Sequence, residues 1–405
     1  VFGVEPPGAR WRDPFLAGKL ATALPEGVWR FANDPGPEIR SGERAALAFL
    51  LGAYRFRRYR KGKANQARLV APAGVDVARL QRLADAVEMG RDLVNTPAND
   101  MGPEALEAAA VALAKGHGVK ARVVRGERLL RDNFPLIHAV GRAAAEEPRL
   151  VDFAWGPAKA PKVTLVGKGV CFDTGGLDIK PSSAMLLMKK DMAGAATALA
   201  AARMIMESGL KVRLRVLIPI VENAVDAGSF RPGDVYPSRK GLSVEIGNTD
   251  AEGRLILADA LALADEEAPD LLFDFATLTG AARVALGPDL PPFYCTDEAT
   301  AAEIAEIGVE ANDPVWRLPL WRPYDALLDG KISDLVNVSS GPFAGSITAA
   351  LFLQRFVEKA KSWAHFDVYG WNPSAKPGRP EGGEVQAARL VHELVERRYG
   401  GRGRE

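Results

Sequence analysis

The chain has 405 residues, of which 47% are hydrophobic and 25% are charged. This length predicts two domains, and the composition excludes a disordered protein because it supplies enough apolar residues for large buried cores. The 52 Lys and Arg nearly balance the 51 Asp and Glu, so the formal net charge of +1 provides no overall attraction to nucleic acid or to an anionic membrane.

The predicted elements begin with a small α/β unit over residues 1–75. Within it, residues 43–59 are predicted to form a helix and residues 68–72 a strand. Apolar residues then recur at helical spacing over residues 76–94, which predicts a helix that connects this unit to the rest of the chain. We therefore expect a small N-terminal α/β domain, a connecting helix and a larger domain over residues 95–405.

Strands and helices alternate along the larger domain. The predicted strands, each a nearly continuous apolar run, are 119–125, 162–168, 212–221 and 270–277. The predicted helices are 103–115, 193–208, 251–266, 298–310, 347–362 and 384–398. This alternation is typical of an α/β fold in which helices cover both faces of a mostly parallel or mixed sheet, giving three layers. Such sheets bind their ligands at the carboxyl ends of the strands.

The chain contains two cysteines, Cys171 and Cys295. They exclude a disulfide framework and a CxxC motif, and we expect Cys171 to be a small buried hydrophobe. Residues 1–7 contain no charged stretch followed by an apolar one, and no run of 18 uncharged apolar residues occurs. We therefore expect neither a signal peptide nor a membrane-spanning helix, and we predict a cytoplasmic location.

The four histidines are His117, His138, His365 and His392. None belongs to an HExxH motif, because residues 392–396 read HELVE. We expect all four to be structural or solvated, so the sequence does not predict a zinc site built from histidines.

Acidic and basic side chains gather instead where predicted strands end and predicted helices begin. Because strand ends and helix starts meet at one edge of an open α/β sheet, these groups are expected to lie close together. The side chains concerned are Lys168, Asp173, Lys180, Asp191, Asp250, Glu252 and Arg254.

Each sequence segment that carries these side chains also has a simpler structural interpretation. Thr249 and Glu252 are spaced as a helix capping box. Asp191 is placed to favour the positive end of the next helix, and Lys180 precedes Pro-Ser in what could be a simple turn. Residues 167–169 read GKG, but neither GxGxxG nor a P-loop motif follows. Capping does not explain why Asp250, Glu252 and Arg254 alternate with small residues.

Taken together, three stretches closely resemble the leucyl aminopeptidase family. They are VGKGVCFDTGGLDIKPSSAMLLMKKDMAGAA (166–196), RPGDVYPSRKGLSVEIGNTDAEGRLILADAL (231–261) and DFATLTGA (274–281). The octapeptide NTDAEGRL within the second stretch is highly specific to that family. The resemblance covers roughly residues 90–370 and is weaker over the N-terminal unit.

The resemblance implies a site with two divalent metal ions and two catalytic side chains. The implied metal ligands are Lys168, Asp173, Asp191, Asp250 and Glu252, and the implied catalytic pair is Lys180 and Arg254. Four carboxylates balance two dications, and oxygen ligands suit Mn²⁺, Zn²⁺ or Mg²⁺. A lysine binds metal only as the neutral amine, and nearby dications would lower its pKa as this requires.

The implied reaction removes the N-terminal residue of a peptide, with a leucine-like preference. Two ions roughly 3.5–4 Å apart would activate a shared water, and one of them would hold the free α-amine. Lys180 would polarise the scissile carbonyl, and the planar fork of Arg254 would hold a bicarbonate ion that serves as general base. The turn formed by Thr277, Leu278, Thr279 and Gly280 resembles the family's substrate-contacting segment.

The family forms hexamers, so the resemblance also implies a homohexamer that acts on short peptides. Some members of the family bind DNA, and residues 54–63 interleave three aromatic with six basic residues. The alternative for this stretch is aromatic packing at a core edge beside a solvated basic face, and the neutral overall charge favours that alternative.

A two-metal phosphatase or nuclease is a second class that uses clustered carboxylates. Such sites usually include histidines or phosphate-binding amides, and this sequence supplies neither near the three stretches. A catalytically inactive interaction protein is also not expected, because every implied ligand is present.

Overall fold

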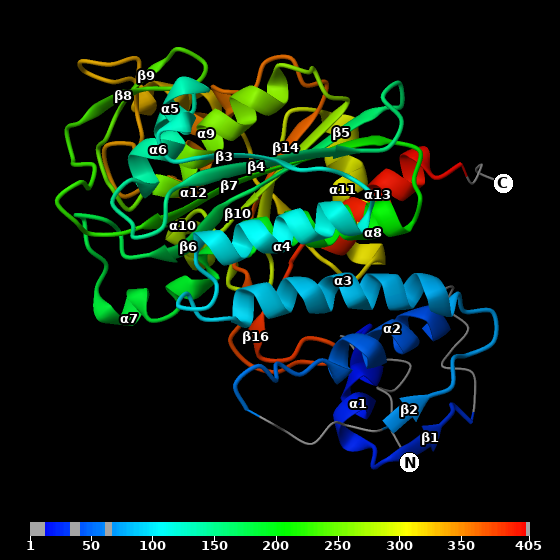
Figure 1. Ribbon diagram of the computed structural model, residues 1–405. Coiled ribbons are helices and arrows are strands. Elements are labelled where there is room, and N and C mark those ends of the chain that lie inside the picture. The colour runs from blue at the N-terminus through cyan, green and yellow to red at the C-terminus, as the bar shows by residue number, and fades with distance from the viewer. Residues whose placement is uncertain (1–12, 33–40, 61–66, 402–405) are drawn as a thin grey trace.

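The computed structural model describes residues 13–32, 41–60 and 67–401 (Figure 1). A small N-terminal unit lies against one side of a larger three-layer body, as the sequence predicts. Within the described residues, no helix is long and apolar enough to cross a bilayer.

The N-terminal unit is a small α/β structure. Its two short strands pair in parallel, and Leu20 and Phe49 pack together with Leu69 in a minor apolar cluster. The predicted strand 68–72 is shorter than expected. The elements of this unit are η1 (Leu16–Lys19), α1 (Leu20–Ala23), β1 (Gly27–Trp29), α2 (Ser41–Ala53) and β2 (Ala67–Leu69).

Helix α2 ends at Ala53, so the predicted helix 43–59 is wrong beyond this point. The hydroxyl of Tyr54 donates to Asp92 Oδ1 at 2.6 Å and accepts from Asn95 Nδ2 at 2.9 Å. These side-chain hydrogen bonds draw the chain away from the helical path, because they place the buried Tyr54 against the next helix.

That next helix is α3 (Val77–Asn95), and it matches the predicted connecting helix. Asp76 caps its start by accepting the backbone N–H of Arg79 at 2.9 Å. The buried side chains Leu80, Leu83 and Val87 belong to the core shared with the larger body. Helix α3 therefore lies between the N-terminal unit and the larger body, in contact with both (Figure 1).

One nine-stranded sheet forms the middle layer of the larger body in the described residues, in the order β12-β11-β14-β10-β5-β7-β4-β3, with β6 also paired to β7. The central strands β14, β10, β5 and β7 are parallel, whereas β4 and β3 are antiparallel at one edge. The strands are β3 (Arg122–Arg125), β4 (Arg149–Trp155), β5 (Lys162–Gly167), β6 (Gly169–Asp173), β7 (Arg213–Asn223), β10 (Leu271–Ala276), β11 (Pro292–Cys295), β12 (Trp316–Arg317) and β14 (Trp363–Asp367).

Helices cover both faces of this sheet, and each face has its own apolar core. On the face toward α3 lie α4 (Pro103–Gly116), α8 (Ala193–Glu207), α11 (Glu298–Glu310) and α13 (Ala388–Tyr399). On the other face lie α5 (Arg128–Arg131), α6 (Pro135–Gly141), α9 (Glu252–Asp265) and α12 (Gly345–Gln354). Figure 1 shows the two helical layers on either side of the strands.

Shorter elements line the edges of the body. A three-stranded sheet pairs β13 with β9 and β9 with β8, and a two-stranded sheet pairs β15 with β16. Their bounds are β8 (Val235–Pro237), β9 (Ser243–Glu245), β13 (Leu335–Val336), β15 (Trp371–Asn372) and β16 (Gly382–Gly383). The remaining short helices are α7 (Ser182–Met185), η2 (Met188–Met192), α10 (Gly280–Leu286) and η3 (Arg322–Leu328).

Helix α12 is much shorter than the predicted helix 347–362, because a buried carboxylate accepts hydrogen bonds from the backbone amides that follow it. Asp265 accepts the backbone N–H groups of Glu358, Lys359 and Ala360 at 2.8–3.0 Å. These amides would otherwise donate within a helix, so the segment forms a turn around Asp265.

Helix α13 begins at Ala388 and not at residue 384 as predicted. Asp313, from the loop after α11, accepts the backbone N–H groups of Ala387 at 3.0 Å and Arg389 at 3.1 Å. This carboxylate caps the helix from another part of the chain, which a local sequence pattern does not reveal.

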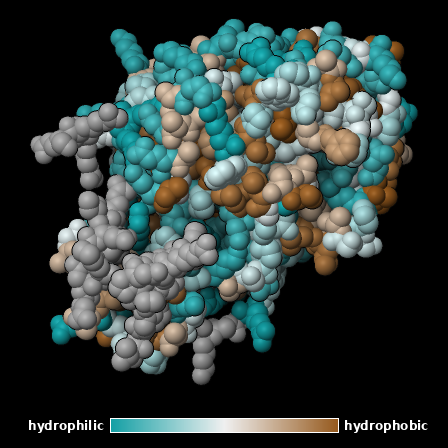
Figure 2. Space-filling view, turned by 180° about the vertical axis from the view of Figure 1, so that it is seen from behind, coloured by the Kyte–Doolittle hydropathy of each residue, from teal (hydrophilic) through white to brown (hydrophobic). Residues whose placement is uncertain are grey.

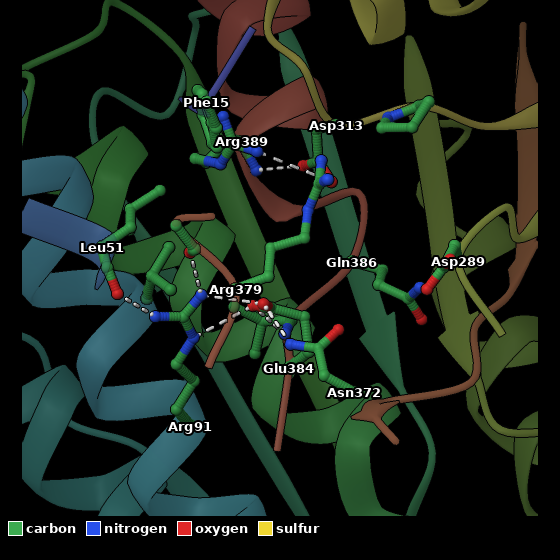
Figure 3. Close-up of a pocket in the computed structure, with 14 residues that line it drawn as sticks. Phe15, Leu51, Arg91, Asp289, Asp313, Asn372, Arg379, Glu384, Gln386 and Arg389 are labelled. Carbon is green, nitrogen blue, oxygen red and sulfur yellow. Dashed lines mark hydrogen bonds and ion pairs between the residues drawn. The ribbon is translucent and has the colours of Figure 1, made fainter. Parts of the chain in front are cut away.

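A buried ion pair joins α3 to the segment that precedes α13 (Figure 3). Arg91 donates to both carboxylate oxygens of Glu384, at 2.8 and 3.2 Å, and to the backbone oxygens of Leu51 and Gly378. Asn372 Nδ2 donates to the same carboxylate at 2.9 Å. Arg91 thereby links α2, α3 and the C-terminal segment beside the small pocket of Figure 3, whose lining contains none of the predicted site residues.

We predict that Glu384→Gln destabilises the protein in a pH-dependent way. Burial alone would raise the pKa of Glu384, but the charge of Arg91 outweighs it and lowers the pKa from 4.5 to about 2. The stabilisation of about 3 kcal/mol is therefore complete above the ordinary pKa and is lost as the pH falls toward 2. Urea unfolding should show a large difference between wild type and variant at pH 7 and less than half of it at pH 3.

The matched control is Glu381→Gln, which changes an exposed glutamate three residues earlier. It should leave the urea midpoint unchanged at both pH values. An equal effect of the two variants at pH 7 would show that the ion pair does not supply the stabilisation.

Candidate functional site

The side chains singled out from the sequence meet at the carboxyl ends of the central strands. Lys168 follows β5 and precedes β6, Asp173 ends β6, and Thr277 follows β10. The break between β5 and β6 is tightly packed, because a Cβ on Gly167 would lie 2.7 Å from the backbone oxygen of Gly194. Gly167 therefore allows close packing between the sheet and α8, and Gly169 allows close packing against Pro219 of β7. These packing roles account for both glycines without a nucleotide.

Lys168 is the buried centre of one half of the cluster. Its Nζ lies 2.7 Å from Asp191 Oδ2 and 2.9 Å from Glu252 Oε1. It also donates to the backbone oxygen of Thr277 at 3.0 Å. Asp191 comes from η2 and Glu252 from the first residue of α9, so three separate elements meet at this amine.

Lys180 is the centre of the other half. Its Nζ lies 2.8 Å from Asp173 Oδ2 and also contacts Asp250 Oδ1. Asp173, Asp250 and Glu252 each offer an oxygen, and these three oxygens lie within 4.8 Å of one another. The two halves thus form one continuous cluster of four carboxylates and two lysines.

The electrostatics show an excess of negative charge in the cluster. Burial, followed by the nearby Asp173, raises the pKa of Glu252 to about 8 and that of Asp250 to about 6. Burial also raises the pKa of Asp191. For Lys168 and Lys180, burial lowers the pKa but the neighbouring carboxylates outweigh it, so both pKa values lie above the ordinary value. Additional positive charge would therefore stabilise this arrangement.

The donor set fits divalent cations. Asp191 Oδ2, Asp250 Oδ1 and Glu252 Oε1 are buried and accept no well-oriented hydrogen bond, although a lysine nitrogen lies near each of them. Clustered carboxylate oxygens are the ligands that Mn²⁺, Mg²⁺ and Zn²⁺ accept in proteins. The cluster is thus a candidate centre for two such ions.

Arg254 is the third residue of α9 and is buried. Its Nη1 donates to the backbone oxygen of Asn337 at 2.7 Å, whereas its Nε has no partner. Burial lowers the pKa of Arg254 to about 10. Among the described residues no carboxylate lies within ion-pair distance of it, so the guanidinium has free donor capacity for an anion.

The turn from Thr277 to Gly280 lies directly beside the cluster. The hydroxyl of Thr277 donates to Asp191 Oδ1 at 2.7 Å, and its carbonyl accepts from Lys168. The amides of Leu278 and Thr279 point to a different carboxylate, Asp367, at 3.1 and 3.3 Å. Gly280 then begins α10.

The capping interpretation of Thr249 and Glu252 is wrong. Helix α9 has Ala251 at its N-cap and no side-chain capping bond. The hydroxyl of Thr249 donates to the backbone oxygen of Gly175 at 2.7 Å, and Glu252 faces Lys168. Asp191 lies just before α8, and its oxygens face Thr277 and Lys168.

The sequence pattern missed Asn223, which ends β7 and is fully buried. Its Nδ2 donates to Asp173 Oδ1 at 2.8 Å and to the backbone oxygen of Thr249 at 3.1 Å. It therefore orients one carboxylate and anchors the loop that carries Asp250. The strand-end rule would have found Asn223 had the predicted strand 212–221 been extended by two residues.

The histidines lie in other contacts. His117 Nδ1 lies 2.9 Å from the backbone oxygen of Leu113, and His138 Nε2 lies 3.2 Å from Glu127. His365 is fully buried and its Nδ1 lies 2.5 Å from Asp274 Oδ1. Each of these histidines thus has a structural partner.

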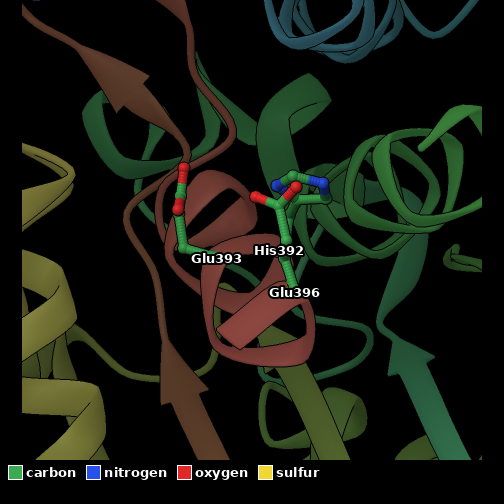
Figure 4. A group of neighbouring side chains, drawn as sticks. All are labelled: His392, Glu393 and Glu396. Carbon is green, nitrogen blue, oxygen red and sulfur yellow. The ribbon is translucent and has the colours of Figure 1, made fainter. Parts of the chain in front are cut away.

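His392 belongs with Glu393 and Glu396 to a second group of potential ligands on α13 (Figure 4). Arg79 of α3 pairs with both glutamates, at 2.9 Å in the case of Glu396, and His392 Nε2 lies 2.9 Å from Ser208 Oγ. Arg79 already pairs with both carboxylates, so the group is part of an ion-pair network that joins α13 to α3.

The basic stretch 54–63 is described only as far as residue 60, and its last three residues lie outside the described part. Tyr54 is buried against α3, and Tyr59 donates its hydroxyl to Asp100. The ring of Phe56 packs edge to face on Tyr59 with centroids 5.9 Å apart. Tyr54 therefore follows the packing alternative, whereas Tyr59 is 54% exposed, and these contacts do not test binding of DNA.

Comparisons with known proteins identify the class. The family model described as "Cytosol aminopeptidase family, catalytic domain" matches residues 88–394, and "M17 aminopeptidase, N-terminal domain" matches residues 9–72. The chain thus has both the catalytic and the N-terminal domain of this class of proteins. More particularly, the chain is a member of the cytosol aminopeptidase family.

The relatives support this assignment. A probable cytosol aminopeptidase of Chlamydia abortus is 45% identical over 295 residues, which is 72% of this chain and 59% of the relative. One from Chlorobium luteolum is 38% identical over 376 residues, covering 85% of this chain and 74% of the relative. The chain thus spans only about three fifths of the length of its first relatives.

Solved structures agree with the fold. A cytosol aminopeptidase of Coxiella burnetii superposes with a TM-score of 0.92 at 50% identity, covering 95% of this chain and 84% of the other. The bottromycin maturation enzyme BotP in complex with Mn gives a TM-score of 0.89 at 35% identity, covering 95% and 86%.

We predict that Gly253→Ala disturbs the cluster by displacing Lys168. A Cβ at this position would lie 2.6 Å from Lys168 Cε and 2.7 Å from its Nζ. The flexible lysine can move, but it then leaves Asp191 and Glu252 without their counterion, which costs about 1–3 kcal/mol. The urea midpoint should fall by the corresponding amount.

Gly116→Ala is the control, because a Cβ there meets no atom within 4 Å. It should leave the midpoint unchanged or raise it slightly, as alanine favours a helix. Wild-type stability of Gly253→Ala would mean that the amine has room to move without loss.

Proposed function

We propose that the chain is a metal-dependent aminopeptidase that removes the N-terminal residue from peptides. The observation that carries the proposal is the convergence of Asp173, Asp191, Asp250 and Glu252 from three chain segments around Lys168 and Lys180. Membership of the cytosol aminopeptidase family supports the same activity. An acidic cluster without histidine ligands also favours this class over the phosphatases and nucleases.

The metal ligands in this proposal are the five residues that the sequence predicts. Asp173, Asp250 and Glu252 offer oxygens close enough to share ions, and Asp191 and Lys168 complete the set. When bound, the two divalent cations would supply the positive charge that activates water and stabilises the developing oxyanion. Mn²⁺ has the direct support of the BotP structure, whereas Zn²⁺ and Mg²⁺ rest on ligand chemistry.

Lys168 has a special place among these ligands. Its amine now lies between Asp191 and Glu252, where the positive charge balances two carboxylates. Binding a cation through nitrogen requires the neutral amine, so Lys168 would give up its proton when cations take over this balance.

Lys180 and Arg254 are the proposed catalytic pair. Lys180 lies on the open side of the carboxylates, with its side chain 13% exposed, so its ammonium can reach a scissile carbonyl and stabilise the charge that develops there. Arg254 has an unpartnered Nε and a planar fork that matches bicarbonate, which would act as general base.

The proposed substrate contacts lie in the turn Thr277, Leu278, Thr279 and Gly280. This turn borders the cluster through Thr277, so a peptide whose amine meets the metal centre would run along it. A leucine-like preference and a cytoplasmic location are both proposals supported by the resemblance and by the names of the relatives. We also propose the domain division 1–75, 76–94 and 95–405.

A homohexamer is the proposed assembly. Large apolar side chains are exposed on the larger body, and Figure 2 shows brown apolar areas across its middle. Examples are Phe343 at 84% exposure and Leu186 at 85%. Exposed aromatic and aliphatic side chains of this size favour burial between copies of the chain.

We predict a sedimenting species of six times the chain mass of 43.4 kDa. Burial of the exposed apolar side chains should hold it together in high salt, because screening weakens charge pairs but not apolar contacts. Analytical ultracentrifugation at low and high ionic strength measures this mass, and a monomer in both would contradict the assembly.

Two substitutions separate metal binding from catalysis. Asp250→Ala should lose bound Mn²⁺ and turnover of leucine p-nitroanilide together, because it removes a ligand. Lys180→Ala should keep the metal but lose turnover by roughly 100-fold or more, because it removes only the group that polarises the carbonyl. Metal content by mass spectrometry and steady-state rates provide the two readouts.

The control is Lys211→Ala, which removes an exposed lysine in the loop before β7 and should retain full activity. An N-acetylated leucine substrate should not be cleaved, since it lacks the free amine. Wild-type rates for either site variant would refute the roles, and turnover of p-nitrophenyl phosphate in place of the anilide would refute the peptidase.

A further inference from the structure

One buried carboxylate beside the site has no part in the mechanism proposed above. Asp367 ends β14 and is fully buried. Its strand neighbour in the sheet is Ala276, the last residue of β10, so Asp367 lies next to the point where the turn of residues 277–280 begins. A buried carboxylate is costly unless its oxygens are satisfied, and its partners therefore indicate what it does.

Most of the partners of Asp367 belong to that turn. Its Oδ1 accepts the backbone N–H of Leu278 at 3.1 Å and of Thr279 at 3.3 Å. Its Oδ2 accepts the hydroxyl of Thr279 at 2.6 Å. The same Thr279 oxygen accepts the N–H of Ala282 at 3.1 Å, so the contact continues into the first turn of α10.

The remaining partners hold Asp367 itself. Arg283 Nη2 lies 3.1 Å from Oδ1 and also donates to the Asp367 backbone oxygen, which supplies the balancing positive charge. Ser346 Oγ donates to Oδ2 at 3.2 Å and is in turn held by Tyr294, at 2.7 Å. The carboxylate is thus anchored from α10, α12 and β11, and the turn is oriented by a rigid acceptor.

We propose that Asp367 is a positioning residue that sets the backbone of the 277–280 turn for peptide binding. The inference rests on the proposed aminopeptidase function. Thr277 is fixed from the cluster side by Asp191 and Lys168. Asp367 fixes Leu278 and Thr279 from the opposite side, so the turn is held between two anchors.

This arrangement decides which backbone groups the turn offers to a substrate. The amides of Leu278 and Thr279 are occupied by Asp367, so neither is free for a peptide carbonyl. Their carbonyl oxygens accept none of the side-chain or tertiary hydrogen bonds found among the described residues. The turn therefore presents acceptors, which suit the N–H groups of a peptide main chain beyond the scissile bond.

The test variant is Asp367→Asn, assayed with the tripeptide Leu-Gly-Gly. The amide oxygen can still accept the two backbone N–H groups, but the nitrogen cannot accept from Thr279 and Ser346. We expect KM to rise roughly tenfold while kcat changes by less than about threefold, because uniform binding of the main chain is lost. Bound Mn²⁺ should stay at the wild-type level, since Asp367 contacts none of the proposed ligands.

A gentler pair of variants tests the same contact without altering a buried charge. Thr279→Val removes the hydroxyl that donates to Asp367 and should raise KM in the same direction. Thr279→Ser keeps that hydroxyl, so its KM should lie closer to the wild-type value than the KM of Thr279→Val. These two variants allow the positioning role to be tested even if Asp367→Asn folds poorly.

Asp274→Asn is the matched control for loss of a buried carboxylate. Asp274 lies on the neighbouring strand β10, is fully buried, and pairs with His365 and Trp363 without touching the turn. It should change stability but not KM.

The possible outcomes distinguish this inference from the proposed aminopeptidase function on which it rests. Absence of aminopeptidase activity in the wild type would refute the proposed function. An active wild type with unchanged KM in Asp367→Asn and Thr279→Val would overturn the positioning role alone. Equal KM changes in Asp274→Asn and Asp367→Asn would also overturn it, because they would reflect general damage to the sheet.

Discussion

The structure depends on one electrostatic constraint, which is the concentration of four carboxylates at one edge of a buried sheet. Such a group is unstable without positive charge, and the chain supplies it through Lys168 and Lys180. Both lysines are themselves largely buried, so their charges act at low dielectric and the balance between them and the acids is strong. Burial, followed by the charge of Asp173, nevertheless raises the pKa of Asp250 and Glu252, so the lysines do not fully offset the cost of placing these acids here. The fold thereby creates a defined site at which bound cations would be stabilising.

The three-layer architecture meets this constraint by bringing loops together that are distant in sequence. Parallel strands β5, β7, β10 and β14 end at the same edge, and each end contributes a group to the site or to its support. Asn223 orients Asp173, Thr277 orients Asp191, and Asp367 holds the turn after β10. Helix η2, which leads into α8, and helix α9 lie at the same edge and bring Asp191 and Glu252 inward. Residues that only support the site thus surround the proposed reactive ones, which is typical of sites that need accurate geometry.

The sequence predicted the centre of the sheet well because strands β5, β7 and β10 are continuous apolar runs. It missed β14, whose residues include His365 and Asp367, because polar residues at a buried position break the apolar pattern. Because β14 was not predicted, no sequence pattern indicated the proposed role of Asp367. The predicted helix ends were wrong where a side chain distant in sequence accepts hydrogen bonds from backbone amides. Asp265 does so after α12, and Asp313 does so before α13. Glu252 shows the limit most clearly, since a capping glutamate and a cluster glutamate have the same local pattern, and only the position of Lys168 separates them.

The glycines on either side of Lys168 have a consequence for how this chain can vary over evolutionary time. A side chain at position 167 would collide with the backbone of α8, and one at position 169 would lie 2.7 Å from the backbone oxygen of Pro219. Selection at both positions therefore acts through the architecture of the sheet and not through chemistry. A descendant that had lost both the proposed peptide hydrolysis and the acidic partners of Lys168 could replace the lysine but not its two neighbours. In such a descendant, Gly167 and Gly169 would remain although the residue between them had changed.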